Sequence, residues 1–167
     1  MPRKGLIQRQ LVLTVLFFMV LGCAATLAPT YDKALFEGLT ASNSGVMEFF
    51  ASVAGGTTKE TFEHRQARYA NLIGRFDAME IQARARPVPN TKVTAKINEI
   101  LTKRGLPIPD DNEIPSAVAL GKISGTLAKM RDTDKKQGVT ATEVQAFRNQ
   151  VAIYLDQALT YESFLER

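Results

Sequence analysis

The sequence TTKETFEHRQARYANLIGRFDAMEIQARAR, residues 57–86, is the stretch from which the fold is predicted. Its apolar side chains recur every three or four residues and form one stripe: Phe62, Tyr69, Leu72, Ile73, Phe76, Met79 and Ala83. This spacing is typical of an α-helix that packs one face against a core. Residues Thr57 to Glu60 have the pattern of a capping box, and Pro87 ends the predicted helix.

The same spacing of apolar residues predicts four further helices. They cover residues 31–56, 92–105, 115–135 and 140–165. The last of them opens with a second capping-box pattern, and no segment shows the two-residue alternation of a half-buried strand. We therefore expect an all-α fold, a mostly antiparallel bundle of four long helices plus one short helix, in a single domain of residues 31–167.

The amino-terminal residues have a different composition. The first ten residues, MPRKGLIQRQ, carry three basic side chains and no acid, and an uncharged apolar run follows from Leu11. A basic segment followed by a short apolar segment is the layout of a secretory signal peptide. The run ends on Val20-Leu21-Gly22-Cys23, and Cys23 is the only cysteine of the chain.

This motif resembles the lipobox of bacterial lipoproteins, in which an aliphatic residue lies three positions before an invariant cysteine and a small residue directly precedes it. Val20 and Gly22 fill these two positions. The resemblance implies that residues 1–22 are a signal peptide removed by cleavage, that Cys23 is lipidated, and that residues 23–30 form the lipidated tether. It places the protein in the cell envelope, attached to a membrane.

Two other interpretations of this segment stay open. Leu11 to Ala28 is an apolar stretch of 18 residues, near the lower limit for an uncleaved membrane-spanning anchor. Cys23 could also be a free thiol packed among apolar neighbours. Ala24 differs from the Asp that commonly retains lipoproteins at the inner membrane, so in a host with two membranes we expect the outer membrane, with the domain facing the periplasm.

The later part of the chain carries a second resemblance. The segments Tyr31-Asp32, Gly38-Leu39-Thr40 and Met130 to Thr133 are similar to those of uncharacterised small helical envelope lipoproteins. This resemblance implies no known activity, and it assigns no catalytic residue.

The distribution of charge argues against a nucleic-acid partner. The chain has 21 basic and 17 acidic residues, a net charge of +4. Three of the basic residues and none of the acidic ones precede Cys23, so the remainder of the chain is close to neutral. Since the basic excess belongs mainly to the predicted signal peptide, we expect no nucleic acid as a partner.

Residues for metal or catalytic chemistry are scarce. His64 is the only histidine, and together with one cysteine it supplies too few ligands for a di-iron, thiolate-zinc or c-type haem site. The sequence contains neither a Gly-x-Ser-x-Gly elbow nor a glycine-rich phosphate loop. We therefore expect no catalytic residues, no metal and no cofactor, and hence a protein that is not an enzyme.

One segment has some features of a calcium loop. Residues 132–143 carry acids at the first, third and twelfth positions of an EF-hand pattern: Asp132, Asp134 and Glu143. The fifth position is Lys136, which places a positive charge where a dication would bind, and the sixth lacks the required glycine. We interpret the segment as the end of one helix, a turn at Gly138 and the cap of the next helix.

The candidate functional residues are four arginines of the helix predicted over residues 57–86. Arg65 projects into the apolar stripe, where an unpaired charge is costly. It either pairs with an acid of another helix, reaches water at the bundle end, or forms an internal site for an anion or head group. Arg68, Arg75 and Arg86 share a row beside the stripe, which is either a solvated face or a partner surface.

These observations favour a membrane-tethered, non-enzymatic envelope lipoprotein that acts as an interaction or assembly module. Its partners would be the membrane, through the lipid anchor, and an envelope protein. The alternative is a carrier or sensor of a small apolar or anionic ligand bound between the helices. A hydrolase is disfavoured because His64 is the only histidine available as a general base.

The motif at Cys23 can be tested by substitution. Cys23→Ser should block lipidation and cleavage, because the thiol is the acylated atom in the family that the motif resembles. Metabolic labelling with palmitate, together with the mass of the protein, should show a labelled, shortened native chain and an unlabelled variant of full length. A native protein that retains Met1 and takes up no label would support the uncleaved anchor.

Overall fold

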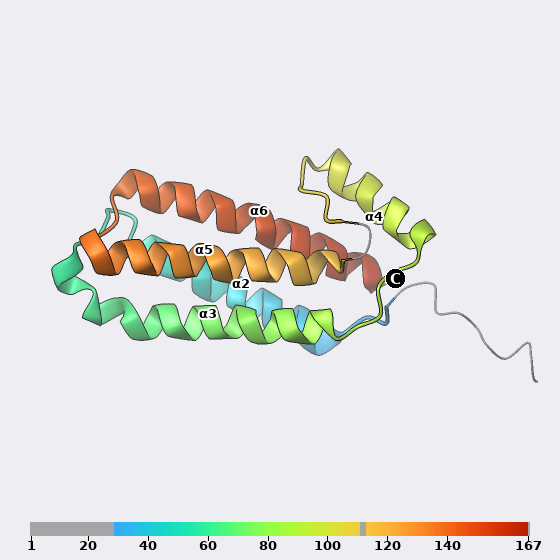
Figure 1. The fold of residues 1–167 in the computed structure, drawn as a ribbon, viewed down its shortest axis with the longest axis horizontal. Coiled ribbons are helices and arrows are strands. Elements are labelled where there is room, and N and C mark those ends of the chain that lie inside the picture. Colours follow the sequence, from blue (N-terminus) through green and yellow to red (C-terminus); the bar gives the residue numbers. More distant parts are fainter. Residues whose placement is uncertain (1–28, 111–112, 167) are drawn as a thin grey trace, which may run out of the picture.

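Four long helices run along a common axis in the computed structural model, which describes residues 29–110 and 113–166 (Figure 1). These helices are α2 (Lys33–Ser52), α3 (Glu63–Arg84), α5 (Pro115–Gln137) and α6 (Ala141–Leu165). A shorter helix, α4 (Thr91–Lys103), packs outside the bundle against α6, and a 3-10 turn (Lys59–Thr61) precedes α3. The described residues contain no strand, so the predicted all-α bundle is confirmed.

The long helices form a closed ring of four. Helix α2 contacts α3 and α6, and α5 contacts the same two helices. Arg65, near the start of α3, bonds to Asp134, near the end of α5, so these two helices run antiparallel. The short connections between α2 and α3 and between α5 and α6 reverse the chain in the same way (Figure 1). Each long helix is therefore antiparallel to both of its neighbours, as the prediction requires.

The apolar stripes read from the sequence face the inside of this ring. Tyr69 and Phe76 of α3 are fully buried, and the side chains of the other helices meet them in one continuous core. The fully buried residues of α2, α5 and α6 include Leu35, Leu39, Leu120, Ile123, Leu127, Met130, Val151, Ala158 and Tyr161. Helix α4 adds Ile97 and Leu101, which cover the outside of the core at one end.

Side-chain caps begin α2, α4 and α6, whereas α3 and α5 start without one. Thr140 forms the predicted capping box with Glu143, in which each side chain bonds to the backbone N–H of the other residue. The capping box predicted at residues 57–60 is wrong, because α3 begins only at Glu63. The hydroxyl of Thr57 is used elsewhere: it donates to Asp134 and accepts from the backbone N–H of Val139.

Two glycines allow the connections at this end of the bundle to touch. Gly56 and Gly138 have φ values of 93° and 81°, which residues with a side chain rarely adopt. A Cβ atom on Gly138 would lie 2.5 Å from the carbonyl oxygen of Thr57. The backbone N–H of Thr57 donates to the carbonyl of Val139 over 2.7 Å, so the two connections are hydrogen-bonded side by side.

The amino-terminal predictions lie largely outside the described residues. This holds for the signal peptide of residues 1–22, for Cys23 and for most of the tether. Among the helices that are described, none combines the length and the apolar composition needed to cross a membrane.

Substitution by alanine should have opposite effects on stability at Gly138, which is in close contact with Thr57, and at Gly125, which is not in contact with any neighbour. Gly138→Ala should lower the free energy of unfolding by at least about 1–3 kcal/mol, the cost of holding a non-glycine residue in such a backbone conformation. Gly125→Ala, on the open face of α5 with no neighbour within 4 Å, should instead raise it by about 1 kcal/mol through helix propensity. Urea denaturation followed by circular dichroism would measure both, and equal effects would contradict the described turn.

Candidate functional site

One of two buried ion pairs among the described residues joins Arg65 of α3 to Asp134 of α5. The guanidinium binds the carboxylate with two nitrogens: Nε donates to Oδ2 and Nη2 donates to Oδ1, each over 2.8 Å. The Asp134 side chain is fully buried, and that of Arg65 is only 15% exposed. Paired, charge-assisted hydrogen bonds of this kind are among the strongest that side chains form.

Two further residues complete the surroundings of Asp134. The hydroxyl of Thr57 donates to Oδ1 over 2.6 Å, and that of Tyr69 donates to Oδ2 over 3.2 Å. The ring of Tyr69 is held edge-on against Phe49 of α2, with the ring centroids 4.7 Å apart. Each carboxylate oxygen thus accepts two hydrogen bonds, as a buried charge requires.

The electrostatics of the cluster favour the charged form of this pair. Burial by itself would raise the pKa of the Asp134 carboxyl, but the hydrogen bonds from Arg65 and Thr57 outweigh it and hold the pKa below its usual value. The hydrogen bond to Asp134 also raises the pKa of Arg65. Burial, with the nearby negative charge of Asp134, raises the pKa of the Tyr69 hydroxyl, which therefore stays protonated and acts as a donor.

This geometry identifies the partner that the sequence required for Arg65. The remaining donors of the guanidinium also point to acceptors of the chain, since Nη1 donates to the Thr61 hydroxyl and Nη2 to the Thr58 carbonyl. The position predicted as an internal anion site at Arg65 is filled by the chain's own carboxylate, Asp134. The cluster therefore fastens α3, α5 and the connection before α3 to one another.

A second buried pair lies at the opposite end of the bundle. Arg86, just after α3, donates through Nη1 to Oε2 of Glu162 over 2.9 Å and through Nη2 to Oε1, while Nη2 also donates to the Ser116 hydroxyl. Glu162 is fully buried, and the guanidinium carbon lies 5.8 Å from the centre of the Tyr161 ring. Burial would lower the pKa of Arg86, but the bonds to Glu162 raise it overall.

The predicted row of Arg68, Arg75 and Arg86 is therefore wrong as a single exposed surface. Helix α3 ends at Arg84, so the helical spacing that aligned Arg86 with the other two no longer applies there. Arg75 is exposed. Arg68 is half-exposed, and its Nη2 donates to the carbonyl of Gly45 and, at 3.4 Å, to Glu48, both of α2.

Neither Asp134 nor Glu162 was predicted as the partner of an arginine, although the position of each acid along its helix indicates that it is buried. Asp134 lies four residues after Met130 and seven after Leu127, so it continues the buried stripe of its helix. Glu162 lies four residues after Ala158, also on a buried face. An acid on a stripe predicts a buried partner, but helical periodicity cannot say which arginine that partner is.

The segment weighed as a calcium loop has the predicted helix–turn–helix structure. Helix α5 continues to Gln137, and Gly138 caps it. Asp134 is bound to Arg65, and Glu143 is bound to Thr140, so neither is directed at a common centre. Among the described residues, no group of three or more His, Cys, Asp or Glu side chains could hold a metal ion. His64 is exposed on α3.

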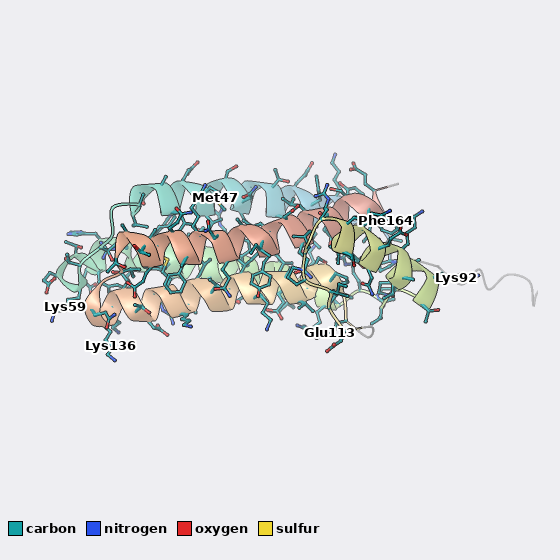
Figure 2. All side chains as sticks on the ribbon, turned by 90° about the horizontal axis from the view of Figure 1, so that it is seen from above. Met47, Lys59, Lys92, Glu113, Lys136 and Phe164 are labelled. Atoms are coloured by element: carbon teal, nitrogen blue, oxygen red, sulfur yellow. The ribbon has the colours of Figure 1, made fainter. Side chains whose placement is uncertain are left out.

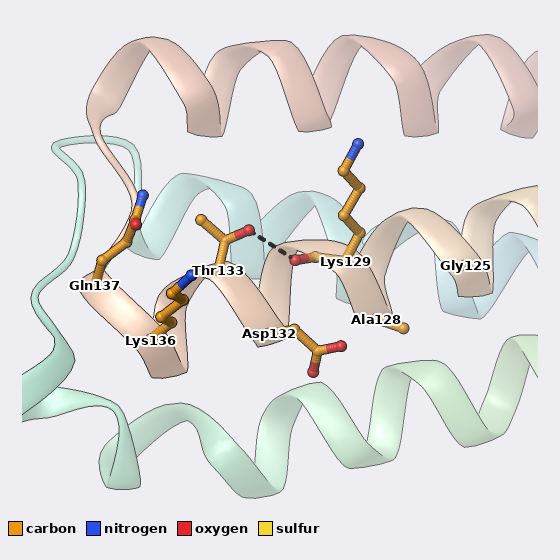
Figure 3. A pocket seen from close by; sticks show the side chains of 7 residues that line it. All are labelled: Gly125, Ala128, Lys129, Asp132, Thr133, Lys136 and Gln137. Atoms are coloured by element: carbon orange, nitrogen blue, oxygen red, sulfur yellow. Dashed lines mark hydrogen bonds between the residues drawn. The ribbon is translucent and has the colours of Figure 1, made fainter.

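The hollows near these residues are open grooves on the outside of the bundle. One of about 560 Å³ lies on α5, lined by Gly125, Ala128, Lys129, Asp132, Thr133, Lys136 and Gln137 (Figure 3). In it the side chain of Lys129 points towards α6 and that of Asp132 towards α3, and the hydroxyl of Thr133 donates to the Lys129 carbonyl. A second, of about 500 Å³, is bordered by Arg65, Thr58 and Thr140.

The fold and these clusters define an all-helical bundle whose two ends are each held by a buried arginine–carboxylate pair. The sequence matches no protein-family model, and neither curated proteins nor solved structures give a significant match. What the protein does has therefore to be inferred from its own residues.

The charge on Asp134 predicts how stability depends on pH. Because its pKa is lower in the folded chain than the value of about 3.9 in an unfolded one, the ionised carboxylate stabilises the fold above that pH. This stabilisation is lost as the pH falls through the folded-state pKa. Asp134→Asn should lower the free energy of unfolding by about 3 kcal/mol at pH 7, the lower end of the range for breaking a buried pair.

Denaturation at pH 7, 5 and 3 would test this expectation. The difference between the native protein and Asp134→Asn should be smaller at pH 3 than at pH 7, because below about pH 3.9 the unfolded chain takes up a proton at this carboxyl that the folded chain binds less readily. Asp132→Asn is a matched control, because its side chain is exposed two residues away, and it should change stability by less than about 0.5 kcal/mol. A difference that does not vary with pH would contradict the assignment of a buried charged pair.

Proposed function

We propose that this protein is a membrane-tethered, non-enzymatic envelope lipoprotein that acts as an interaction or assembly module. The lipobox-like motif ending at Cys23 supports the tether. The arrangement of arginines supports the role as an interaction module, because Arg65 and Arg86 form ion pairs inside the bundle and therefore stabilise the fold. Partner recognition is then left to the outer surface of the bundle.

The observation that carries the proposal is the outward face of α3. Arg75 is exposed there, and beside it runs a stripe of exposed small or apolar residues: Ala67, Ala70, Gly74, Ala78 and Ile81. These five positions fall within roughly 80° of one another at 100° per residue. Ile81, at 71% exposure, is the most exposed of the large apolar residues in the described chain.

This face suits a protein partner. Small side chains let a second helix approach closely, since the distance between packed helices depends on the side chains at the contact. Arginines at the edge of such a face can pair with carboxylates or stack on rings, which is why arginine is enriched at interfaces. Arg68 and Arg75 flank the stripe on one side, so the proposed partner surface keeps two of the three arginines first considered.

The alternative, a carrier or sensor of a small ligand, has one feature in its favour. The groove of about 500 Å³ beside Arg65 is open to solvent and is lined by several hydroxyl-bearing residues. Asp134 already neutralises Arg65, however, so an anion entering this groove would meet little net positive charge. We therefore place this function second.

The partner surface can be tested by reversing its charge. Arg68→Glu combined with Arg75→Glu should reduce the capture of partners by cross-linking in envelope membranes, and the remaining capture should be sensitive to salt. Stability should change by less than about 1 kcal/mol, because both arginines are exposed and the pair with Glu48 is a surface pair.

Lys122→Glu combined with Lys129→Glu is the matched control. It makes the same change of charge on exposed positions of α5 and should leave capture unchanged. If both double variants capture the native set of partners equally well, the α3 face is not the partner surface.

A further inference from the structure

The start of the described chain lies at one defined end of the bundle. The carboxylate of Asp32, just before α2, accepts a hydrogen bond of 2.7 Å from Gln82, near the end of α3. The loop to α4, the first turns of α4 and the carboxyl end of α6 lie at this same end (Figure 1). Lys59 and Lys136 mark the opposite end (Figure 2).

The length of the tether limits how far this end can be from a membrane. Six peptide steps separate Cys23 from Pro29, which is the first described residue. Fully extended, they span about 20 Å. An uncleaved apolar segment ending near Ala28 would bring the bundle still closer. In the tethered protein that we propose, the end of the bundle that carries α4 is therefore the end next to the bilayer.

Side chains suited to a lipid surface are exposed at this end. Val88, in the loop before α4, is 50% exposed. Lys92 and Lys96 are exposed one turn apart on α4, and neither forms an ion pair with an acid in the described part of the chain. The ammonium of Lys96 lies 6.0 Å from the centre of the Phe164 ring. Figure 2 shows Lys92 at the extreme end of the molecule.

Two acids near α4 are neutralised by basic partners. Glu99 of α4 is bound to Lys103 over 2.6 Å. Asp156 of α6 is bound to Arg104. Glu113, in the loop before α5, lies farther back along the bundle than Lys92 (Figure 2). Asp32 and Glu166 also lie at this end, near Tyr31. The positive charge is therefore confined to the exposed face of α4, where Lys92 and Lys96 form no ion pair with an acid of the described residues.

We infer that residues 88–96 form a docking surface for anionic phospholipids, in which Val88 enters the interface and Lys92 and Lys96 contact the head-group phosphates. This inference rests on the tether of the proposed function. Docking would hold the bundle upright on the membrane, with the connections around Gly138 directed away from it and the α3 face exposed along the side.

Single-tryptophan variants of the full-length protein test this orientation, because the native chain has no tryptophan. Val88→Trp and Ile153→Trp form a matched pair: the native side chains are 50% and 47% exposed, and Ile153 lies within α6, away from the tip. Each variant is reconstituted into phosphatidylcholine vesicles with brominated acyl chains, with or without phosphatidylglycerol. Bromine quenches tryptophan only at close range, so we expect quenching for Val88→Trp in the anionic vesicles and none for Ile153→Trp.

The lysines are tested in the Val88→Trp background. Lys92→Gln combined with Lys96→Gln should lower the ratio of docked to undocked protein about fivefold for each lysine removed, and added salt should act in the same direction. Lys135→Gln combined with Lys136→Gln, at the opposite end of the bundle, should have no effect.

Flotation of the vesicles separates failure of this inference from failure of the tether. Protein that does not float with the vesicles would overturn the proposed tether and the docking together. Protein that floats while Val88→Trp stays unquenched would overturn the docking alone. Equal quenching of Val88→Trp and Ile153→Trp would also overturn it, and equal quenching in neutral and anionic vesicles would exclude recognition of the head groups.

Discussion

The buried ion pair between Arg65 and Asp134 is the contact on which one whole end of the bundle depends. It joins α3 to α5, and through Thr57 it also fixes the connection that leads from α2. Removing either charge would leave the other in a site with few alternative partners. The Thr57 hydroxyl that donates to this carboxylate also accepts from the backbone N–H of Val139, beside the close approach of the two connections at Gly138.

The pair between Arg86 and Glu162 plays the corresponding part at the other end. Helix α3, at 1.5 Å per residue, separates the two pairs by about 30 Å. Since bidentate contacts tolerate little displacement, two of them at such a distance fix how the helices are aligned along the axis. A bundle held at both ends suits a rigid module that presents its outer faces, which is the function we propose for it.

The predicted row of three arginines is wrong because helix α3 ends before the last of them. Arg68, Arg75 and Arg86 share a row only while the helical spacing continues, and α3 stops at Arg84. Beyond that point the backbone turns, and the guanidinium of Arg86 reaches Glu162 and Ser116 inside the bundle. The capping box expected at residues 57–60 failed for a related reason, because a tertiary hydrogen bond to Asp134 competes for the Thr57 hydroxyl.

The sequence by itself determined the helices and their inward faces, because the positions of side chains around a helix follow from the geometry of the local backbone. It also supplied the basic and apolar segments that lead to Cys23. Only the tertiary structure decided which acid meets which arginine, since Arg65 and Asp134 are 69 residues apart and Arg86 and Glu162 are 76 apart. Those pairings depend on how the helices stack and slide past one another, which local spacing does not encode.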